Sequence, residues 1–333
     1  MKTKIIAEVG VNHNGDFKKA KKIILEAKKI GVKIIKFQFY RTEKLIFPNT
    51  PMAKYQSSNY KNDIITDQYK MLKKFELKPE EHINLSKFCK KIGIEYCCSF
   101  FHEDDVDYVS KLSLKRIKIP SGELNNFFLL KKIAKLNKKV ILSTGMSDDK
   151  NLKKILGFLY KNGLDKKKIT VLHCCSSYPT LTKDLNLNSI NFIKRKFKIR
   201  VGFSDHSESI ITPMIAVLKG AEVIEKHLTL SNKLSGPDHK ASLNIENFKK
   251  MLDLIKFAED SVGFEKKTIK ASEKKNIYFV KKSLVAKKDI KKGEKFNFDN
   301  LTAMRPQKGV PLDKLLFMIG KKSKKNYKKN QII

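Results

Sequence analysis

Eight short apolar runs recur along most of the chain, and long amphipathic segments separate them. The runs are KIIAEVG (4–10), VKIIKFQF (32–39), IEYCCSF (94–100), RIKIPS (116–121), KVILSTG (139–145), ITVLHCCSS (169–177), RVGFSDH (200–206) and VIEKHL (223–228). The separating segments, such as FKKAKKIILEAKKIG, close with a glycine that suits a helix C-cap. Strands that are apolar on both faces and alternate with helices indicate a parallel sheet covered by helices. The repeat therefore predicts an α/β fold that closes into a (β/α)8 TIM barrel.

The repeat ends near residue 264, and the rest of the chain has a different character. Residues 265–276 are charged and weakly apolar, which is typical of a linker. Residues 277–333 consist of short alternating runs and turns, so we expect a small β-rich domain that docks on another surface. The predicted barrel occupies residues 1–264. An insertion at 41–78 is longer than an ordinary crossover and polar enough to pass over one face of the barrel.

The formal net charge of +37 restricts the partners that this chain can have. A charge of this size can signal nucleic-acid binding. The lysines, however, are spread over nearly every amphipathic segment and form no single stripe with interleaved aromatic residues. We therefore expect a solvated lysine-rich surface, no nucleic-acid partner, and a positive field that attracts phosphate and carboxylate groups.

Cysteine use and hydropathy indicate the compartment. The five cysteines form no C-x-x-C spacing, and four of them are neighbouring pairs inside apolar runs, which favours buried, reduced thiols. The chain starts without a charged leader followed by an apolar segment, and no window approaches the roughly 18 apolar residues of a membrane span. We expect a soluble cytoplasmic protein with no membrane partner.

Polar side chains stand at the end of nearly every predicted strand, although an unpaired polar group is costly inside an apolar strand. In a parallel barrel the carboxyl ends of all strands meet on one face, where the catalytic groups of such enzymes gather. The polar residues at or just beyond the strand ends include Glu8, Lys36, Gln38, Ser99, Lys118, Ser121, Glu123, Ser176, Tyr178, Ser204, His206, Glu225 and His227. Their convergence predicts one active site on this face.

Two lysines, Lys36 and Lys118, are candidates for binding an anionic substrate. Together with the serine hydroxyls they would form a cradle for a phosphate and a carboxylate. The alternative is a structural role, in which both lysines pair with buried carboxylates. Glu123 also has two possible roles, because it follows PSG, where an acidic residue can cap a helix N-terminus. Beside Ser121 and Lys118 it also suits proton transfer at a reacting carbon.

His206 and His227 end the last two predicted strands, which are neighbours in a closed barrel. Two imidazoles with water completing the shell favour an exchangeable Mn²⁺, Mg²⁺ or Co²⁺ over a structural Zn²⁺. Such an ion would act as a Lewis acid toward a carbonyl oxygen. Tyr178, which precedes a proline, is a candidate substrate contact. Asp238, in the turn SGPDHKAS (235–242), lies at the rim of the same face.

Nine motifs together carry a resemblance to a known family. In chain order they are AEVGVNHNGD, KFQ, KIPSGE, LHC, YPT, GFSDHS, IEKHLTL, GPDHKAS and RPQKGVP. By their order and combination the chain resembles the sialic acid synthase family. The resemblance implies that phosphoenolpyruvate condenses with an N-acylated hexosamine and water to give a nine-carbon 2-keto acid and phosphate. The acceptor would be N-acetylmannosamine or 2,4-diacetamido-2,4,6-trideoxymannose.

The same resemblance implies a role for each candidate residue. Phosphoenolpyruvate would be held by Lys36, Ser99, Lys118, Ser121, Ser176 and Ser204, and the sugar by Glu8, Gln38, Tyr178 and Asp238. Glu123 would be the catalytic carboxylate, with Lys36 and Lys118 stabilising charge, and His206 and His227 would bind the metal, Mn²⁺ first among the candidates. The last domain resembles the antifreeze-like (SAF, β-clip) module, which is swapped across a homodimer in this family. Arg305 would then bind the N-acyl end of the sugar in the partner's site, and Phe279 would help to close it.

Two positions depart from the family pattern. Ser99 stands where some members carry Thr, and Ser176 where some carry Asn, so the phosphate-side contacts would be shorter or water-bridged. KIPSGE and GPDHKAS favour the neuraminic and legionaminic acid synthases, whereas CCSSYP leans toward the pseudaminic branch. The alternatives are therefore a pseudaminic acid synthase, another barrel enzyme that condenses phosphoenolpyruvate with a phosphorylated sugar, and a basic nucleic-acid-binding protein.

Overall fold

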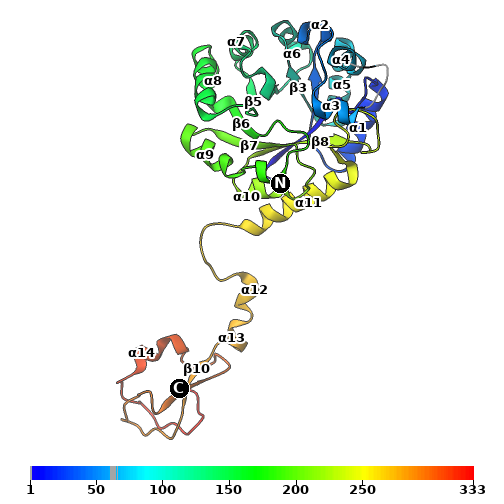
Figure 1. Cartoon of the computed structure of the whole chain (residues 1–333). Coiled ribbons are helices and arrows are strands. Elements are labelled where there is room, and N and C mark those ends of the chain that lie inside the picture. Colours follow the sequence, from blue (N-terminus) through cyan, green and yellow to red (C-terminus); the bar gives the residue numbers. More distant parts are fainter. Residues whose placement is uncertain (1, 61–64, 66) are drawn as a thin grey trace. The chain divides into compact units, whose positions relative to one another are not determined.

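Eight parallel strands form a closed barrel in the computed structural model, which describes residues 2–60, 65 and 67–333 (Figure 1). The strands are β1 Lys4–Gly10, β2 Ile34–Phe39, β3 Glu95–Phe100, β4 Arg116–Ile119, β5 Lys139–Ser143, β6 Ile169–Cys174, β7 Arg200–Asp205 and β8 Val223–Thr229. Each strand pairs with the next in parallel, and β8 pairs with β1 to close the ring. The predicted (β/α)8 barrel is confirmed.

Helices surround the barrel on its outer side (Figure 1). They are α1 Phe17–Lys29, α5 Pro79–Ile92, α6 Tyr108–Lys111, α7 Phe127–Lys135, α8 Asp149–Lys161, α9 Asn188–Phe197, α10 Thr212–Leu218 and α11 Ile245–Val262. Their buried residues recur with helical spacing, as in α8, which buries Leu152, Ile155, Leu156 and Leu159. Side-chain caps fix several starts: Asp148 accepts a bond from the Asn151 backbone N–H at 2.8 Å. Of the helices in the described residues, none is long and apolar enough to cross a membrane.

The insertion between β2 and β3 forms three short helices, α2 Thr42–Leu45, α3 Lys54–Asn59 and α4 Gln68–Phe75. Its described apolar side chains pack in a cluster of their own. The buried members of this cluster are Val11, Tyr40, Tyr60, Met71 and Phe75. Val11 and Tyr40 follow β1 and β2, so the insertion is packed against the carboxyl-terminal end of the barrel. A short strand, β9 Leu243–Asn244, pairs with the end of β8.

The interior of the barrel contains an apolar layer. An inner cluster of six buried residues comprises Ile6, Ile34, Cys97, Ile141, Leu172 and Val223. Because side chains alternate along a strand, the residue two positions further on projects into the same interior. In chain order those residues are Glu8, Lys36, Ser99, Ser143, Cys174 and Glu225. A thin apolar layer therefore lies directly beneath a polar layer.

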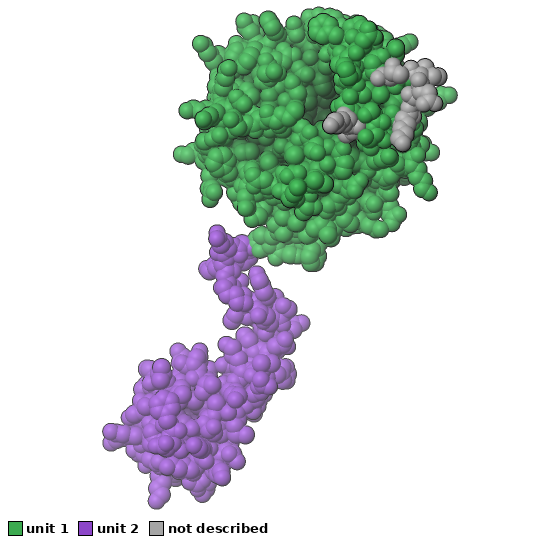
Figure 2. All heavy atoms as spheres, in the orientation of Figure 1, with its two compact units in different colours: residues 1–263 green, residues 264–333 purple. Residues whose placement is uncertain are grey.

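The chain divides into two compact units, residues 1–263 and 264–333, coloured separately in Figure 2. The second unit contains α12 Ala271–Lys274, α13 Ile277–Val280, β10 Ser283–Ala286, β11 Leu301–Met304 and α14 Leu315–Met318. Strands β10 and β11 are antiparallel. Its core is built from Leu284, Ala286, Ile290, Phe296 and Leu301. The segment 265–276, expected to be a linker, contains α12.

Candidate active site

A cavity of 530 Å³ lies at the carboxyl ends of the strands. Twelve of the residues predicted from the sequence line it: Glu8, Lys36, Gln38, Ser99, Lys118, Ser121, Glu123, Ser176, Tyr178, Ser204, His206 and His227. They come from or directly follow seven of the eight strands. Asp238 lines a smaller adjoining cavity with Gln38, Tyr178 and His227. Phe279 and Arg305 belong to the second unit, where both are exposed.

Two ion pairs cross the floor of this cavity. The Lys36 Nζ lies 2.6 Å from Glu8 Oε2, and the Lys118 Nζ donates to Glu225 Oε1 at 3.1 Å. Lys36 also lies 3.9 Å from the other oxygen of Glu225. All four side chains are at most 6% exposed. The structural alternative for the lysines is therefore present in the molecule, since both pair with buried carboxylates.

The two carboxylates experience different electrostatic surroundings. Burial raises the pKa of Glu8 to about 7, against the opposing charge of Lys36. Burial also acts to raise the pKa of Glu225, but the ammonium groups of Lys118 and Lys36 lower it to about 2. Ser204 Oγ adds a hydrogen bond of 2.9 Å to Glu225 Oε1. Glu225 is therefore the fixed anion that holds both lysines at the floor.

The two predicted metal ligands face each other across the cavity. The ring centroids of His206 and His227 are 5.7 Å apart. His206 Nδ1 donates to the Cys175 carbonyl at 2.7 Å, which leaves the lone pair of the neutral ring on Nε2. The buried Nδ1 of His227 has no hydrogen-bond partner in the described residues.

Asp238 lies near the second imidazole. A Cβ placed on Gly10 would contact Asp238 Oδ2 at 3.1 Å and His227 Nδ1 at 3.4 Å. Burial raises the pKa of Asp238 to about 6, against the opposing charge of His206. In the described part of the chain, no group of three or more His, Cys, Asp or Glu side chains is arranged to hold a metal. The facing imidazoles of His206 and His227 are donors that fit an ion whose remaining ligands are water or substrate oxygen.

Glu123 lies in a 3-10 turn, Ser121–Glu123, directly after β4. It does not cap the next helix, because Asn126 caps α7 by accepting the Leu129 N–H at 3.1 Å. Glu123 Oε2 instead accepts a bond of 2.8 Å from the Asn126 amide. Burial raises the pKa of Glu123. A held carboxyl with a raised pKa suits proton transfer.

The predicted hydroxyls do not all point freely into the cavity. Ser204 is bonded to Glu225, and Ser99 Oγ donates to the Phe37 carbonyl at 3.4 Å. Ser121 Oγ accepts the Gly145 N–H at 2.9 Å. A Cβ on Gly145 would lie 2.0 Å from Ser176 Oγ, so only glycine permits this approach.

Comparison with known proteins shows the family. Residues 23–267 match the NeuB family model, and residues 281–333 match the SAF domain. The chain belongs to the NeuB family. It is 44% identical to N,N'-diacetyllegionaminic acid synthase of Campylobacter jejuni, over 100% of this chain and 99% of the relative. It is 35% identical to pseudaminic acid synthase of the same organism, over 97% and 93%. The crystal structure of N-acetylneuraminic acid synthetase from Leptospira borgpetersenii has a TM-score of 0.71 at 29% identity, covering 83% of this chain and 90% of that one.

Glu225 is a residue of this NeuB-family site to which the sequence pattern assigned no role. It was visible as a polar strand end, and its position two residues before His227 puts both on the inner face of β8. The sequence signal for it is a shared spacing: Glu8 lies two residues after Ile6 on β1, and Glu225 lies two residues after Val223 on the neighbouring β8. At Cys174 the sequence pattern likewise indicates only a buried thiol, although this residue lines the cavity and its Sγ lies 3.7 Å from His206 Nδ1.

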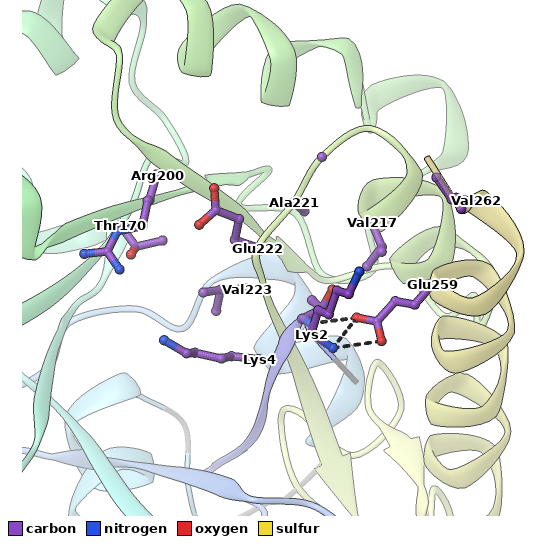
Figure 3. A pocket seen from close by; sticks show the side chains of 13 residues that line it. Lys2, Lys4, Thr170, Arg200, Val217, Ala221, Glu222, Val223, Glu259 and Val262 are labelled. Carbon is purple, nitrogen blue, oxygen red and sulfur yellow. Dashed lines mark hydrogen bonds between the residues drawn. The ribbon is translucent and has the colours of Figure 1, made fainter. Parts of the chain in front are cut away.

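A second cavity, of 390 Å³, lies near the opposite ends of the strands in this NeuB-family barrel (Figure 3). Its lining includes Lys2, Lys4, Arg200, Glu222 and Glu259. Glu259 accepts the Lys2 backbone N–H at 2.9 Å and thereby ties the start of the chain to α11. The amino-terminal face of a TIM barrel ordinarily contributes to stability, whereas the catalytic residues lie at the opposite face.

Proposed function

We propose that this protein condenses phosphoenolpyruvate with an N-acylated hexosamine and water to give a nine-carbon, sialic-acid-type 2-keto acid and phosphate. The observation that carries the proposal is the cavity at the carboxyl ends of the strands. It combines two buried ammonium groups, a facing imidazole pair and a held carboxyl with a raised pKa. The names of the relatives, which are synthases of nine-carbon acids of this kind, support the same class of reaction.

Lys36 and Lys118 bind the phosphate and the carboxylate of phosphoenolpyruvate. An ammonium group has three donors, and the contacts with Glu8 and Glu225 use only part of that capacity. The carboxylates hold both ammonium groups in position at the base of the cavity. The lysines then stabilise negative charge on the substrate throughout the reaction.

His206 and His227 would hold a divalent cation, with Mn²⁺ ahead of Mg²⁺ and Co²⁺, and Asp238 lies beside them. When bound, such a cation supplies Lewis acidity toward the aldehyde oxygen of the open-chain sugar. The site residues place C3 of phosphoenolpyruvate against that aldehyde carbon. The C2=C3 π electrons form the new C–C bond, the aldehyde C=O π bond opens, and its oxygen takes up a proton to become a hydroxyl group. Water adds at C2, Glu123 takes its proton, and the tetrahedral centre releases phosphate by cleavage of its C–O bond.

The second unit completes the proposal. Arg305 and Phe279 are exposed on this unit, and Phe279 is 67% exposed. We assign them to the site of a partner in a domain-swapped homodimer, where Arg305 binds the N-acyl group of the sugar. The enzyme works in the cytoplasm. The similarity to pseudaminic acid synthase makes that activity the second candidate.

The test is a phosphate-release assay with phosphoenolpyruvate and three acceptors, supported by mass spectrometry of the product. The acceptors are N-acetylmannosamine, its 6-phosphate and 2,4-diacetamido-2,4,6-trideoxymannose. We expect a nine-carbon acid with at least one acceptor, loss of turnover after chelation, and recovery when Mn²⁺ is added. Absence of phosphate release with all acceptors would refute the proposal.

The metal assignment has its own variants. His206→Ala and His227→Ala should each lower kcat by about 100-fold or more, equivalent to about 2.7 kcal/mol. His173→Gln is the matched control, because His173 bonds to the Leu185 carbonyl on the outer side of β6 and glutamine keeps that donor. Full turnover of a metal-stripped wild-type sample would contradict the assignment.

A further inference from the structure

A buried ion pair joins β7 and β8 on the outer side of the barrel, where helices cover the sheet (Figure 1). The Lys226 Nζ donates to Asp205 Oδ2 at 2.7 Å, and both side chains are 0% exposed. The two residues are directly paired in the register of the strands. Because side chains alternate along a strand, both project away from the cavity into which Glu225 and His227 point. The pair therefore does not face the proposed substrate site.

The surroundings of this ion pair are apolar. The outward-facing residue two positions before Asp205 is Phe203, and those on either side of Lys226 along β8 are Ile224 and Leu228, all of them in the main hydrophobic core. Removing two charges from water into such a core is costly, and apolar side chains of similar volume would stabilise the barrel at least as well. A demand for stability alone therefore does not explain why charges stand here.

The distinctive feature of the pair is the backbone that it holds. The Lys226 Nζ also donates to the Ser207 carbonyl, and Asp205 Oδ1 accepts the Ser207 backbone N–H at 2.8 Å. Both backbone polar groups of Ser207 are thus bound by the two partners of the ion pair. Strand β7 ends at Asp205, so these bonds fix the path of the chain where it leaves the sheet. His206 lies between the two anchored residues.

Each member of the pair is the sequence neighbour of one predicted metal ligand. His206 follows Asp205, and His227 follows Lys226. The His206 carbonyl also accepts the Thr180 backbone N–H at 3.0 Å. The last register pair of the two strands is therefore locked directly before both imidazoles, whose ring centroids are 5.7 Å apart. A change in the path of the chain at this point would change that separation.

We propose that Lys226 and Asp205 are positioning residues, which hold the imidazoles of His206 and His227 at the separation needed to share one divalent cation. The inference rests on the metal assignment in the proposed function. Groups that orient metal ligands from behind contribute about 10- to 100-fold in metal affinity. Apolar replacements would keep the barrel folded but release the backbone of Ser207, and the imidazoles would then bind the cation more weakly.

The experiment measures Mn²⁺ binding by the full-length protein without substrate, using electron paramagnetic resonance of the free ion. We expect the wild type to bind one Mn²⁺ per chain, and Lys226→Met/Asp205→Leu to raise the Kd by about 10-fold or more. The urea midpoint of this variant in EDTA should equal or exceed that of the wild type. Lys226→Arg should keep the Kd within about threefold, because a guanidinium can donate to both the carboxylate and the Ser207 carbonyl.

Two further double variants complete the design. Lys226→Met/Asp205→Asn keeps a side-chain oxygen for the Ser207 N–H, so it should raise the Kd by a smaller factor. Arg116→Met/Glu95→Leu is the matched control, because it replaces another largely buried ion pair between neighbouring strands, with side chains 11% and 16% exposed. Both control residues begin their strands, at the end of the barrel opposite to the imidazoles, so the Kd should not change.

The outcomes separate a positioning role from a purely structural one. A Kd close to that of the wild type in both double variants at positions 205 and 226 would overturn the inference. Failure of both to fold would also overturn it, because the ion pair would then be required for stability. Absence of Mn²⁺ binding by the wild type would overturn the metal assignment of the proposed function together with this inference.

Discussion

Removing Glu225 should destabilise the barrel through the lysine that it leaves behind. In Glu225→Leu, Lys118 loses its bond of 3.1 Å while its side chain is 3% exposed, and Ser204 loses its acceptor. Breaking a buried ion pair from one side costs about 3–5 kcal/mol, because the remaining charge is uncompensated. We therefore expect the free energy of unfolding to fall by about that amount.

The assay is urea unfolding in the presence of EDTA, followed by far-UV circular dichroism, to which the helices of the barrel contribute most. The double variant Glu225→Leu/Lys118→Met removes both charges and should recover most of the loss. Glu246→Leu is the surface control, because the Lys250–Glu246 pair is 55% and 75% exposed and contributes at most about 0.5 kcal/mol. A loss below about 1 kcal/mol in the single variant, or no recovery in the double variant, would refute the reasoning.

Three further predictions follow from the same structure. Glu123→Gln should lower kcat by about 10²- to 10⁴-fold with little change in the KM for phosphoenolpyruvate, and a variant with more than a tenth of the wild-type activity would contradict its role. Because burial raises the pKa of Glu123, wild-type activity should begin to fall on acidification at a higher pH than an exposed glutamate would give. Gly202→Ala should destabilise the protein by about 1–3 kcal/mol, because its Cβ would lie 2.3 Å from the Val223 carbonyl oxygen. Gly157→Ala in α8 meets open space and should stabilise it by about 0.5–1 kcal/mol, so urea midpoints that shift in the same direction in both variants would be inconsistent with this packing. Burial lowers the pKa of His82 to about 3, so below pH 6.5 the unfolded chain binds a proton on this imidazole that the folded chain does not. As the pH falls below 6.5, the free energy of unfolding of the wild type should therefore drop by about 1.4 kcal/mol per pH unit more than that of His82→Gln, and parallel pH profiles of the two proteins would argue against this.

The sequence was sufficient for the barrel because its signal is local and repeated. Each apolar run carries the period of a buried strand, and each separating segment carries that of a helix, so the order of elements follows directly. The convergence of Lys36, Lys118, His206 and His227 on one cavity follows from the same pattern, since the strands of a parallel barrel all point the same way. No knowledge of distances was needed for that step.

Contacts across the barrel could not be predicted in this way. Lys118 is on β4 and Glu225 is on β8, which are not neighbours in the ring, and their bond depends on the width of the closed barrel. The sequence predicted that the insertion passes over one face of the barrel, but not that Leu45, Ile46, Ala53, Gln68 and Leu72 line the cavity. Its helices are short and polar in sequence, so only tertiary packing decides which of their side chains face the cavity.

The apolar layer of six side chains below Glu8, Lys36 and Glu225 closes the cavity at its inner end. Reactants and products must therefore pass through the carboxyl-terminal face of the barrel. The compound held deepest by the lysines has to arrive before the sugar, and it cannot depart while the sugar occupies the opening. Steady-state kinetics should accordingly be sequential and ordered, with the acceptor as the second reactant to bind.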